Sequence, residues 1–251
     1  MGATAAEWGS PTLGVVIPAF DEAASIGWAL RAMRQGLQRL EATDLVARTE
    51  IVVVDDHSSD ATPERIAEAA ELPGPLVRQV EAEGSRGLGS AIRRGFAATD
   101  ADLVLYTDAD LPFDPAELPR MVGVLRRYEA DVLCGYRHDR TVEGTRRALQ
   151  SHVYNALVRA ALPVRVRDVN FACKLFRRAA LDAVAAELRS DGPFIDAELV
   201  ARLSHHDLRV VQLGVDYFPR FDTASTLGGP AAIADIVREG WRLRRELRSG
   251  R

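Results

Sequence analysis

The first half of the chain alternates short apolar runs with longer stretches in which apolar residues recur every three or four positions. The short runs are rich in leucine and β-branched residues, which is typical of strands buried on both faces of a parallel sheet. They are Leu13–Ile17, Ile51–Val54, Leu76–Val80 and Leu103–Tyr106. The longer stretches predict helices over Glu22–Leu40, Pro63–Ala70, Leu88–Ala98 and Pro115–Tyr128. This alternation predicts an α/β fold with a central, mostly parallel sheet, flanked by helices and joined by right-handed crossovers.

The second half of the chain is less regular. Apolar runs and helical spacing predict strands over Val132–Gly135, Ala172–Phe176 and Arg209–Phe218, and helices over Thr145–Leu162 and Phe194–Ser204. The sequence has no internal repeat, low-complexity linker or clear domain boundary. We therefore expect one domain over residues 1–251, with its core at about 13–229 and a basic amphipathic helix at about 230–248.

Composition excludes several classes of protein. Apolar residues make up 47% of the 251, enough for a full hydrophobic core and too many for a disordered chain. The net charge of −4 argues against a general nucleic-acid binder. No apolar run approaches the roughly 18 residues of a membrane span, and the N-terminus lacks the pattern of a signal peptide. Two well-separated cysteines, Cys134 and Cys173, predict buried free thiols in the reducing cytoplasm.

Acidic residues follow three of the predicted parallel strands directly. They are Asp21 and Glu22, Asp55 and Asp56, and Asp108 and Asp110. In an open α/β sheet, ligands bind beyond the carboxyl ends of the strands. Clustered carboxylates repel one another unless a cation or a donor-rich ligand offsets their charge. An ordinary acidic turn explains any one of these clusters, but three at one edge of a sheet favour a binding site.

The segment Asp108-Ala109-Asp110 is the sharpest of these clusters. In an extended segment, residues i and i+2 point the same way, so Asp108 and Asp110 can share one divalent cation. Carboxylate oxygens suit Mg²⁺ or Mn²⁺, which binds few protein ligands and completes its shell with phosphate oxygens of a substrate. We therefore expect a Mg²⁺ or Mn²⁺ cofactor at this position.

Five segments together resemble inverting family-2 glycosyltransferases with the GT-A fold, and most closely the dolichyl- or polyprenyl-phosphate hexose synthase branch. In chain order they are VVIPAFDEAASI, IVVVDDHSSDAT, RGLGSAIRRGF, DLVLYTDADLPFDP and RDVNFACKLFRRAAL. The resemblance covers about Leu13 to Gly229. It implies a nucleotide-sugar-binding fold and transfer of a hexose from a nucleotide diphosphate sugar, with a metal ion on the diphosphate.

The resemblance also implies roles for residues at matching positions. It implies a pocket for the base and ribose of the nucleotide, lined by Pro18, Phe20, Glu22, Asp55 and Asp56, with Asp108 and Asp110 as metal ligands. The segment FPRFDTASTLGG is similar to an element that closes over the donor phosphates, and it nominates Arg220 and Ser225. FIDAEL is similar to an element on the acceptor side, and it nominates Asp196 and Glu198. The implied catalytic residues are Asp110, Asp196, Glu198 and Arg220.

Four positions depart from the family pattern. Asp21 stands where asparagine is usual, His57 where glycine is usual, Pro112 where this branch has glutamine, and Thr226 where the closing element has lysine. The change at Thr226 removes one phosphate-binding cation. Many chains of the polyprenyl branch carry membrane helices after the catalytic domain, and this sequence has none.

Arginine supplies almost all of the positive charge, because Lys174 is the only lysine. The glycine-rich segment Gly84–Gly89 opens a predicted helix, where exposed amides and Arg86 either contact an anion or form a flexible turn. Arg137 follows a predicted strand and either stabilises the leaving diphosphate or lies on a solvated face. We include Arg86 and Arg137 among the candidates for substrate binding.

The need for a catalytic base depends on the acceptor. A hydroxyl acceptor requires a carboxylate to remove its proton, and Asp168, Asp196 and Glu198 are the candidates. A phosphate acceptor is already an anionic nucleophile and needs no base. Asp196 and Glu198 also fit as ordinary acids in the first turn of a helix, where acids are favoured.

The stretch from Pro230 to Arg248 has apolar residues at helical spacing, including Trp241 and Leu243, and is rich in arginine. A basic amphipathic helix that contains tryptophan can lie on an anionic membrane surface. Packing against the protein's own core is the other interpretation, and the one that we favour.

Taken together, these features predict a metal-dependent inverting hexosyltransferase with a donor of the GDP-mannose or UDP-glucose type. The expected acceptor is a polyprenyl phosphate at the cytoplasmic face of the membrane or a small hydroxylated molecule. One alternative is a protein of the same fold that binds a nucleotide sugar or a partner without turnover. Another is a sugar-1-phosphate nucleotidyltransferase, which needs a glycine- and arginine-rich loop after the first strand that PAFDEAAS lacks.

Overall fold

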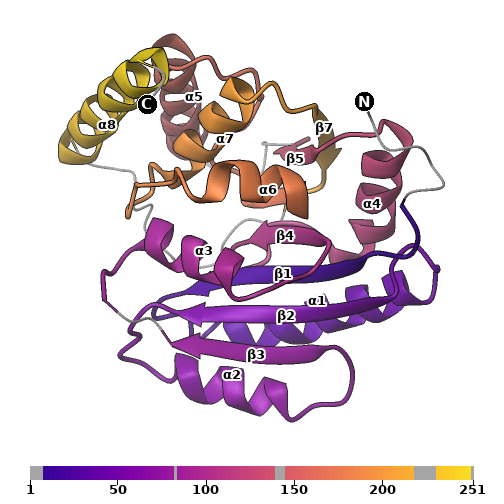
Figure 1. Cartoon of the computed structure of the whole chain (residues 1–251). Helices are drawn as coiled ribbons and strands as arrows, with labels where there is room; N and C mark the ends of the chain where they lie inside the picture. Colours follow the sequence, from indigo (N-terminus) through magenta and orange to yellow (C-terminus); the bar gives the residue numbers. More distant parts are fainter. Residues whose placement is uncertain (1–7, 82–83, 139–144, 218–229, 250–251) are drawn as a thin grey trace.

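The structure is a computed structural model that describes residues 8–81, 84–138, 145–217 and 230–249. Within these residues, seven strands form one sheet in the order β3-β2-β1-β4-β6-β5-β7 (Figure 1). Their bounds are β1 Thr12–Ala19, β2 Arg48–Asp55, β3 Leu76–Glu81, β4 Leu103–Thr107, β5 Val132–Arg137, β6 Cys173–Arg177 and β7 Val210–Val215.

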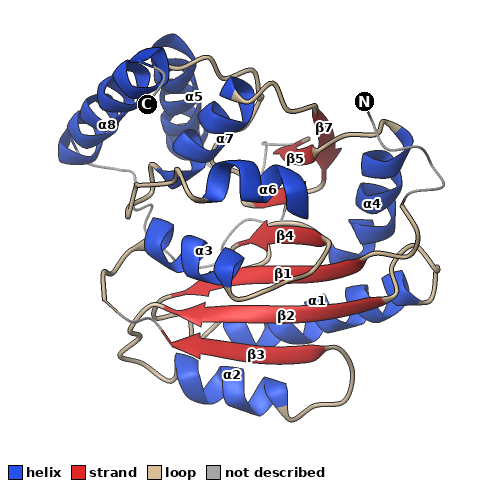
Figure 2. Ribbon diagram, viewed as in Figure 1, coloured by secondary structure: helices blue, strands red, loops and turns tan. Residues whose placement is uncertain are grey.

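The sheet is mostly parallel. β3, β2, β1 and β4 are parallel neighbours, and β5 is parallel to β7. Only β6, between β4 and β5, runs antiparallel to its neighbours in this described sheet. The predicted α/β fold, with a mostly parallel sheet flanked by helices, is confirmed (Figure 2). The reversed direction of β6 was not predicted, because a short apolar run carries no sign of strand direction when both faces of the strand are buried.

Helices lie on both faces of the sheet. Their bounds are α1 Ile26–Glu41, α2 Thr62–Ala70, α3 Leu88–Ala97, α4 Leu118–Arg127, α5 Thr145–Ala161, α6 Arg178–Ala185, α7 Ile195–His205 and α8 Pro230–Ser249, with a short 3-10 helix, η2, over Pro115–Glu117. Each predicted strand and helix is found, with its ends shifted by a few residues. The sequence pattern missed α6, which follows β6 without a connecting loop.

Alternate residues of β1 face opposite sides of the sheet and belong to two separate cores. Leu13, Val15 and Ile17 pack in the core that contains α1 and α4. Val16 packs in the core that contains α3, α5 and α7. Gly95 lets α3 approach β1 closely, because a Cβ at this position would lie 2.2 Å from Val16 Cγ1. The alternation of apolar side chains along β1 therefore places helices on both sides of this strand. We call the sheet edge beyond β1, β2 and β4, which carries Asp21, Glu22, Asp55, Asp56, Asp108 and Asp110, the acidic edge.

The C-terminal helix α8 packs on α5 and α7. Leu243 is 4% exposed, and Gly240 faces Ala161 and Phe194. Packing of α8 against the body, the interpretation favoured from the sequence, is confirmed. Among the helices that the structure describes, none is both long enough and apolar enough to cross a membrane.

The two cysteines are buried free thiols, as predicted. Burial raises the pKa of Cys134 to about 11 and raises the pKa of Cys173 as well. Both thiols therefore stay protonated at neutral pH and act as small apolar side chains.

Candidate active site

The carboxyl ends of β1, β2 and β4 lie at one edge of the sheet. The register pairs Ala19 of β1 with Asp55 of β2, and Val16 of β1 with Tyr106 of β4. Asp108, two residues beyond Tyr106, therefore lies level with the end of β1. This register brings the three acidic segments to one edge, as the alternation of strands and helices predicts.

Asp56 joins the end of β2 to the start of α3. Its backbone N–H donates to the Ala19 carbonyl at 2.8 Å, and its Oδ2 accepts from the Gly87 N–H at 2.7 Å. Gly87 has φ +124°, and a Cβ there would lie 2.3 Å from the Asp191 carbonyl oxygen, so the position requires glycine. The neighbouring Arg86 is exposed. The loop thus presents Arg86 beside the start of α3, where a helix N-terminus attracts anions.

Hydrogen bonds tie the loop after β1 to the loop after β2. The Glu22 N–H donates to Thr62 Oγ1 at 2.8 Å, and the Ala23 N–H donates to Asp60 Oδ2 at 3.1 Å. Asp60 Oδ1 accepts from the Thr62 N–H at 3.0 Å and from its hydroxyl at 2.5 Å. Burial raises the pKa of Asp60, but the hydrogen bonds from Thr62 and Ala23 outweigh burial and hold the pKa below its usual value. The sequence did not place Asp60 or Thr62 in the site, because the acidic segment Asp56-His57-Ser58-Ser59-Asp60 is typical of an ordinary turn and Thr62 fits as a helix N-cap.

Asp21 and His57 both have a left-handed backbone, with φ +52° and +63°. The resemblance places asparagine and glycine at these two positions, and both residues tolerate this conformation well. The Ser59 N–H donates to Asp21 Oδ1 at 2.7 Å, a bond that an asparagine carbonyl oxygen can equally accept. The chain therefore keeps the turn geometry at these positions with different residues.

Four other residues that the resemblance assigns to the nucleotide pocket lie around the ends of β1 and β2. Pro18 is buried, whereas Phe20 is 53% exposed. An exposed aromatic ring next to a polar edge offers a stacking surface for another planar ring. Glu22 is half-buried, and Asp55 is buried with its Oδ1 accepting from the Ser58 N–H at 3.2 Å. The Phe20 ring and the carboxylates of Glu22 and Asp55 together suit the base and ribose of a nucleoside.

Asp108 and Asp110 follow β4 in a tight turn. The Leu111 N–H donates to the Asp108 carbonyl at 3.2 Å, and Leu111 itself has φ +45°. The Tyr106 hydroxyl donates to Asp108 Oδ1 at 3.4 Å. Both aspartates are half-buried. The turn therefore holds two carboxylates at the edge of the sheet while leaving part of each accessible.

The donor set at Asp108 and Asp110 fits a Mg²⁺ or Mn²⁺ ion that the protein shares with a substrate. Carboxylate oxygens are the hard ligands that these ions prefer. In the part of the chain that the structure describes, no group of three or more His, Cys, Asp or Glu residues forms a metal site by itself. Two carboxylates suit an ion whose remaining ligands are phosphate oxygens and water.

Arg137 is paired with Asp168. Arg137 Nε and Nη2 donate to the two carboxylate oxygens of Asp168 at 2.7 and 2.9 Å. The Arg137 side chain is 12% exposed and that of Asp168 is 0% exposed. The guanidinium also lies 5.7 and 5.3 Å from the ring centroids of Phe171 and Tyr217. This arrangement fixes the Arg137 cation rigidly, and it excludes the alternative of a solvated charge.

Asp196 lies in a buried ion pair with Lys174. Lys174 Nζ donates to Asp196 Oδ1 at 2.6 Å and to the Phe171 carbonyl at 3.0 Å. Burial lowers the pKa of Lys174, but the adjacent Asp196 carboxylate outweighs burial, so the pKa is raised overall. Burial raises the pKa of Asp196, and Lys174 offsets part of that rise. Lys174 Nζ is also 5.5 Å from the ring centroid of Tyr106, whose hydroxyl contacts Asp108.

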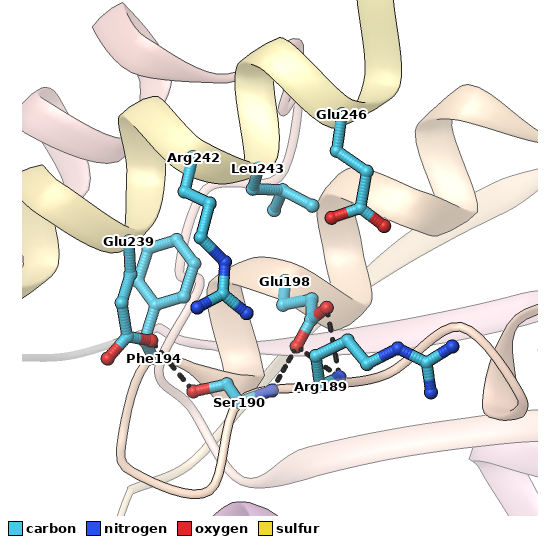
Figure 3. Close-up of a pocket in the computed structure, with 8 residues that line it drawn as sticks. All are labelled: Arg189, Ser190, Phe194, Glu198, Glu239, Arg242, Leu243 and Glu246. Carbon is cyan, nitrogen blue, oxygen red and sulfur yellow. Dashed lines mark hydrogen bonds between the residues drawn. The ribbon is translucent and has the colours of Figure 1, made fainter. Parts of the chain in front are cut away.

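Glu198 is 3% exposed, and its carboxylate binds backbone amides and a guanidinium. It accepts from the Arg189 N–H at 3.1 and 3.0 Å and from the Ser190 N–H at 2.7 Å (Figure 3). It also accepts from Arg202 Nη2 at 2.8 Å and Nε at 3.0 Å. Arg189 and Ser190, which Glu198 holds, are followed by Asp191. The Asp191 carbonyl accepts from the Gly89 N–H, so this segment packs on α3. This geometry favours a supporting role for Glu198 over the catalytic role that the sequence suggested.

A small pocket lies between α8, α7 and the segment that leads into α7. The residues that line it are Arg189, Ser190, Phe194, Glu198, Glu239, Arg242, Leu243 and Glu246 (Figure 3). Ser190 Oγ donates to Glu239 Oε2 at 2.9 Å, and Arg202 Nη2 donates to Glu246 Oε1 at 2.9 Å. The pocket therefore lies at the interface between α8 and the rest of the protein.

Two of the predicted site residues cannot be placed. Arg220 and Ser225 lie in residues 218–229, outside the described residues, as does Thr226. Their assignment to an element that closes over the donor phosphates stays a prediction.

Comparison with known protein families bears on the acidic edge. Residues 14–185 match the family model described as glycosyl transferase family 2. The chain belongs to glycosyltransferase family 2. The matched residues include the ends of β1, β2 and β4, so the acidic edge lies within the family's own region. The resemblance stated from the sequence is therefore confirmed, and membership favours a glycosyltransferase over a sugar-1-phosphate nucleotidyltransferase.

Curated relatives of this family 2 member are longer proteins. Glycosyltransferase AglD of Haloferax volcanii is 31% identical over 229 residues, which cover 90% of this chain and 35% of the relative. An undecaprenyl-phosphate 4-deoxy-4-formamido-L-arabinose transferase of Pseudomonas aeruginosa is 35% identical over 175 residues, which cover 68% of this chain and 49% of the relative. The chain thus spans about a third to a half of these proteins. One domain over residues 1–251 stays a prediction.

Solved structures confirm the fold of this family 2 member. The glucosyl-3-phosphoglycerate synthase of Mycobacterium tuberculosis, in complex with Mn²⁺ and uridine-diphosphate-glucose, is 22% identical and superposes with a TM-score of 0.65. The match covers 96% of this chain and 84% of that one. The sheet and helices described above therefore form the GT-A fold.

Proposed function

We propose that this family 2 glycosyltransferase moves a hexose, with inversion, from a nucleotide diphosphate sugar to a polyprenyl phosphate at the cytoplasmic face of a membrane. The observation that carries the proposal is the acidic edge, where the ends of β1, β2 and β4 meet and Asp108 and Asp110 stand two residues apart. A nucleotide sugar supplies the hydrogen-bond donors and the metal-bound diphosphate that such an edge requires.

The donor residues divide into two groups. Phe20 stacks on the base and Pro18 lines the same pocket, while Glu22, Asp55 and Asp56 accept hydrogen bonds from base and ribose. Asp108 and Asp110 hold Mg²⁺ or Mn²⁺, which when bound offsets the negative charge on the diphosphate. The structural neighbour that contains Mn²⁺ and uridine-diphosphate-glucose supports a UDP-glucose type of donor, with the GDP-mannose type as the other option.

The reaction is a single displacement. An oxygen of the acceptor forms a bond to the anomeric carbon, and the bond from that carbon to the diphosphate breaks on the opposite side. The nucleoside diphosphate leaves with the electron pair, and attack from the opposite side inverts the anomeric centre. Negative charge grows on the leaving diphosphate, so cations beside it, such as Arg137 and Arg86, stabilise the transition state more than the ground state.

The pairing of the three candidate bases supports a phosphate acceptor. The pairs are Asp168–Arg137, Asp196–Lys174 and Glu198–Arg202. A carboxylate in a buried ion pair is a poor proton acceptor, because taking up the proton leaves its partner's charge buried alone. A phosphate acceptor needs no base. The names of relatives point the same way, since they include an undecaprenyl-phosphate transferase and a dodecaprenyl-phosphate galacturonate synthase.

A small hydroxylated acceptor is the second candidate. The neighbouring glucosyl-3-phosphoglycerate synthase was solved with phosphoglyceric acid, a small molecule that is not a lipid. For an acceptor of this kind a base is required, and Asp196, with its raised pKa, is the candidate to test first.

A screen of nucleotides by thermal shift tests the donor site. GDP, UDP and their sugars are each added with and without Mn²⁺ or Mg²⁺. We expect one nucleotide series to raise the melting temperature in a metal-dependent way, because a ligand at a hundred times its Kd stabilises the folded state by about 2.7 kcal/mol. If no nucleotide shifts the melting temperature, the donor site is wrong.

Replacement of one metal ligand tests turnover. We expect Asp110→Asn to lower transfer of radiolabelled sugar to polyprenyl phosphate by about a hundredfold or more, with an unchanged melting temperature in the absence of ligand. Asp100→Asn is the matched control, since Asp100 is an exposed aspartate before β4, at the opposite end of the strand. Metal-dependent nucleotide binding without transfer by the wild-type protein would instead support a binding protein.

A further inference from the structure

One face of helix α8 is turned toward the body of the protein. In the part of α8 whose side chains the structure describes, Glu239 accepts from the Ser190 hydroxyl and Glu246 accepts from Arg202, both at 2.9 Å. Leu243, which lies between these two acids, is 4% exposed. Figure 3 shows Glu239, Leu243 and Glu246 on the side of α8 that borders the pocket. Both acids of the described part of α8 are therefore engaged on its inner face.

The opposite face of α8 is basic and carries one large aromatic ring. Arg238, Arg245 and Arg248 are exposed, and Trp241 is 60% exposed. These positions follow the spacing i, i+3, i+7 and i+10, which places them on one side of an α-helix. We call these four residues the basic stripe.

Two further arginines flank the basic stripe, and one of them, Arg244, helps to hold α8 in place. Arg244 donates to the carbonyls of Ala160 and Ala161 at 3.3 and 3.1 Å, and its guanidinium lies 5.9 Å from the ring centroid of Trp241. Arg242 borders the pocket on the other side (Figure 3). Contacts to α5 and to α7 therefore fix the rotation of α8, so Trp241 stays on the outer surface.

We propose that the basic stripe docks the protein on an anionic lipid bilayer. Arginines attract the phosphates of anionic lipids, and tryptophan partitions to the level of the headgroups, so the stripe has the composition of an interfacial helix. The inference rests on the proposed polyprenyl phosphate acceptor, because a lipid-linked acceptor is reached from a membrane surface. Beyond that proposal, it specifies which face of the protein meets the membrane and explains why that face is basic.

The charge distribution supports this partner. The chain has a net charge of −4, so an anionic surface repels the molecule as a whole and attracts only a face on which positive charge is segregated. On α5, which packs on α8, two apolar side chains one turn apart are also exposed, Val153 at 45% and Leu157 at 37%. Apolar side chains beside arginines suit the boundary between headgroups and acyl chains, whereas a nucleic-acid backbone needs cations alone.

Flotation with vesicles tests the docking surface without nucleotide or acceptor. We expect the protein to bind vesicles of phosphatidylcholine with phosphatidylglycerol, to bind pure phosphatidylcholine weakly, and to be released by high salt. The triple variant R238Q/R245Q/R248Q should bind the anionic vesicles about a hundredfold more weakly, because each arginine contributes about a fivefold gain. The control R31Q/R39Q/R65Q removes the same charge from exposed positions on α1 and α2 and should bind like the wild type.

Trp241 gives an independent signal. We expect tryptophan fluorescence to shift to shorter wavelength on anionic vesicles and expect Trp241→Phe to abolish that shift, since this ring enters the headgroup region. Equal binding by the two triple variants would overturn the proposal, as would the absence of binding to anionic vesicles at low salt. Binding to an RNA or heparin in place of vesicles would also overturn it. The flotation assay contains no nucleotide sugar, so its result is independent of the nucleotide screen. Either the docking proposal or the proposed function can therefore fail without the other.

Discussion

The three buried acids that the sequence offered as bases each have a cationic partner, whereas the buried Asp55 and Asp56 accept hydrogen bonds from backbone N–H groups. A buried charge costs several kcal/mol unless a partner or hydrogen bonds offset it, which explains why no such acid is left alone. Glu198 illustrates the point, because two backbone amides and Arg202 surround a carboxylate that is 3% exposed. Its place in the first turn of α7 and its partner Arg202, four residues further on, are local in the sequence, but its contacts with the Arg189 and Ser190 amides depend on how the chain folds back before α7.

The role of Glu198 can be tested by replacement with glutamine. We expect Glu198→Gln to lower the free energy of unfolding by about 2 kcal/mol, because it removes a charged acceptor from Arg202 and disturbs the amide contacts at Ser190. Urea denaturation measures this loss. Glu187→Gln is the control, since Glu187 contacts the same guanidinium at 3.0 Å but is 38% exposed, and it should cost less than about 1 kcal/mol.

A different outcome would restore the catalytic interpretation of Glu198. If Glu198→Gln keeps its full stability but loses turnover, the carboxylate acts on the acceptor and not on the fold. A variant that is less stable but retains kcat per folded molecule supports the structural role.

At the scale of elements, the acidic edge depends on loops that hold one another in place. Asp60 and Thr62 tie the loop after β2 to the loop after β1, and Asp56 ties β2 to the start of α3 through Gly87. The sheet register brings the strand ends together, whereas these hydrogen bonds orient the loops. The candidate binding surface is therefore built from at least three connections and not from one motif.

Gly87 offers a test of this arrangement. We expect Gly87→Ala to lower stability by about 2 kcal/mol, because φ is +124° and the added Cβ would approach the Asp191 carbonyl to 2.3 Å. The variant should also weaken nucleotide binding, since the Gly87 N–H anchors Asp56. Thermal melts with and without nucleotide measure both effects.

Gly123→Ala is the matched control for this variant. Gly123 lies inside α4, and a Cβ at this position meets no atom within 4 Å. Alanine should therefore stabilise the helix by about 0.5–1 kcal/mol and leave nucleotide binding unchanged. An equal response of the two glycines would contradict the role assigned to Gly87.

At the scale of the whole molecule, the single lysine lies in the interior. Lys174 is 1% exposed and lies on β6, between β4 and β5. Its amine is buried with the Asp196 carboxylate and lies over the ring of Tyr106, two residues before Asp108. Exposure of this amine therefore requires opening of the central core.

Amine labelling tests that conclusion. We expect an amine-selective reagent to leave the Lys174 peptide unmodified in the folded protein and to modify it once urea unfolds the chain, at a rate set by global opening. Mass spectrometry of the digested protein reads the outcome. The control Arg65→Lys places a lysine at an exposed position on α2, and that lysine should react at once. Prompt labelling of Lys174 without denaturant would mean that the core around Asp196 opens locally.

The sequence by itself determined the strands and helices of the alternating half, the edge at which the acids gather, and Asp108-Ala109-Asp110. These features follow from local periodicity and from the rule that parallel strands end at a common edge. Tertiary structure alone decided the direction of β6, the pairing of Asp168 and Asp196 with cations, and the turning of the α8 arginines outward. The physical reason is that burial and charge pairing depend on side chains far apart in the chain, whose positions local spacing does not encode.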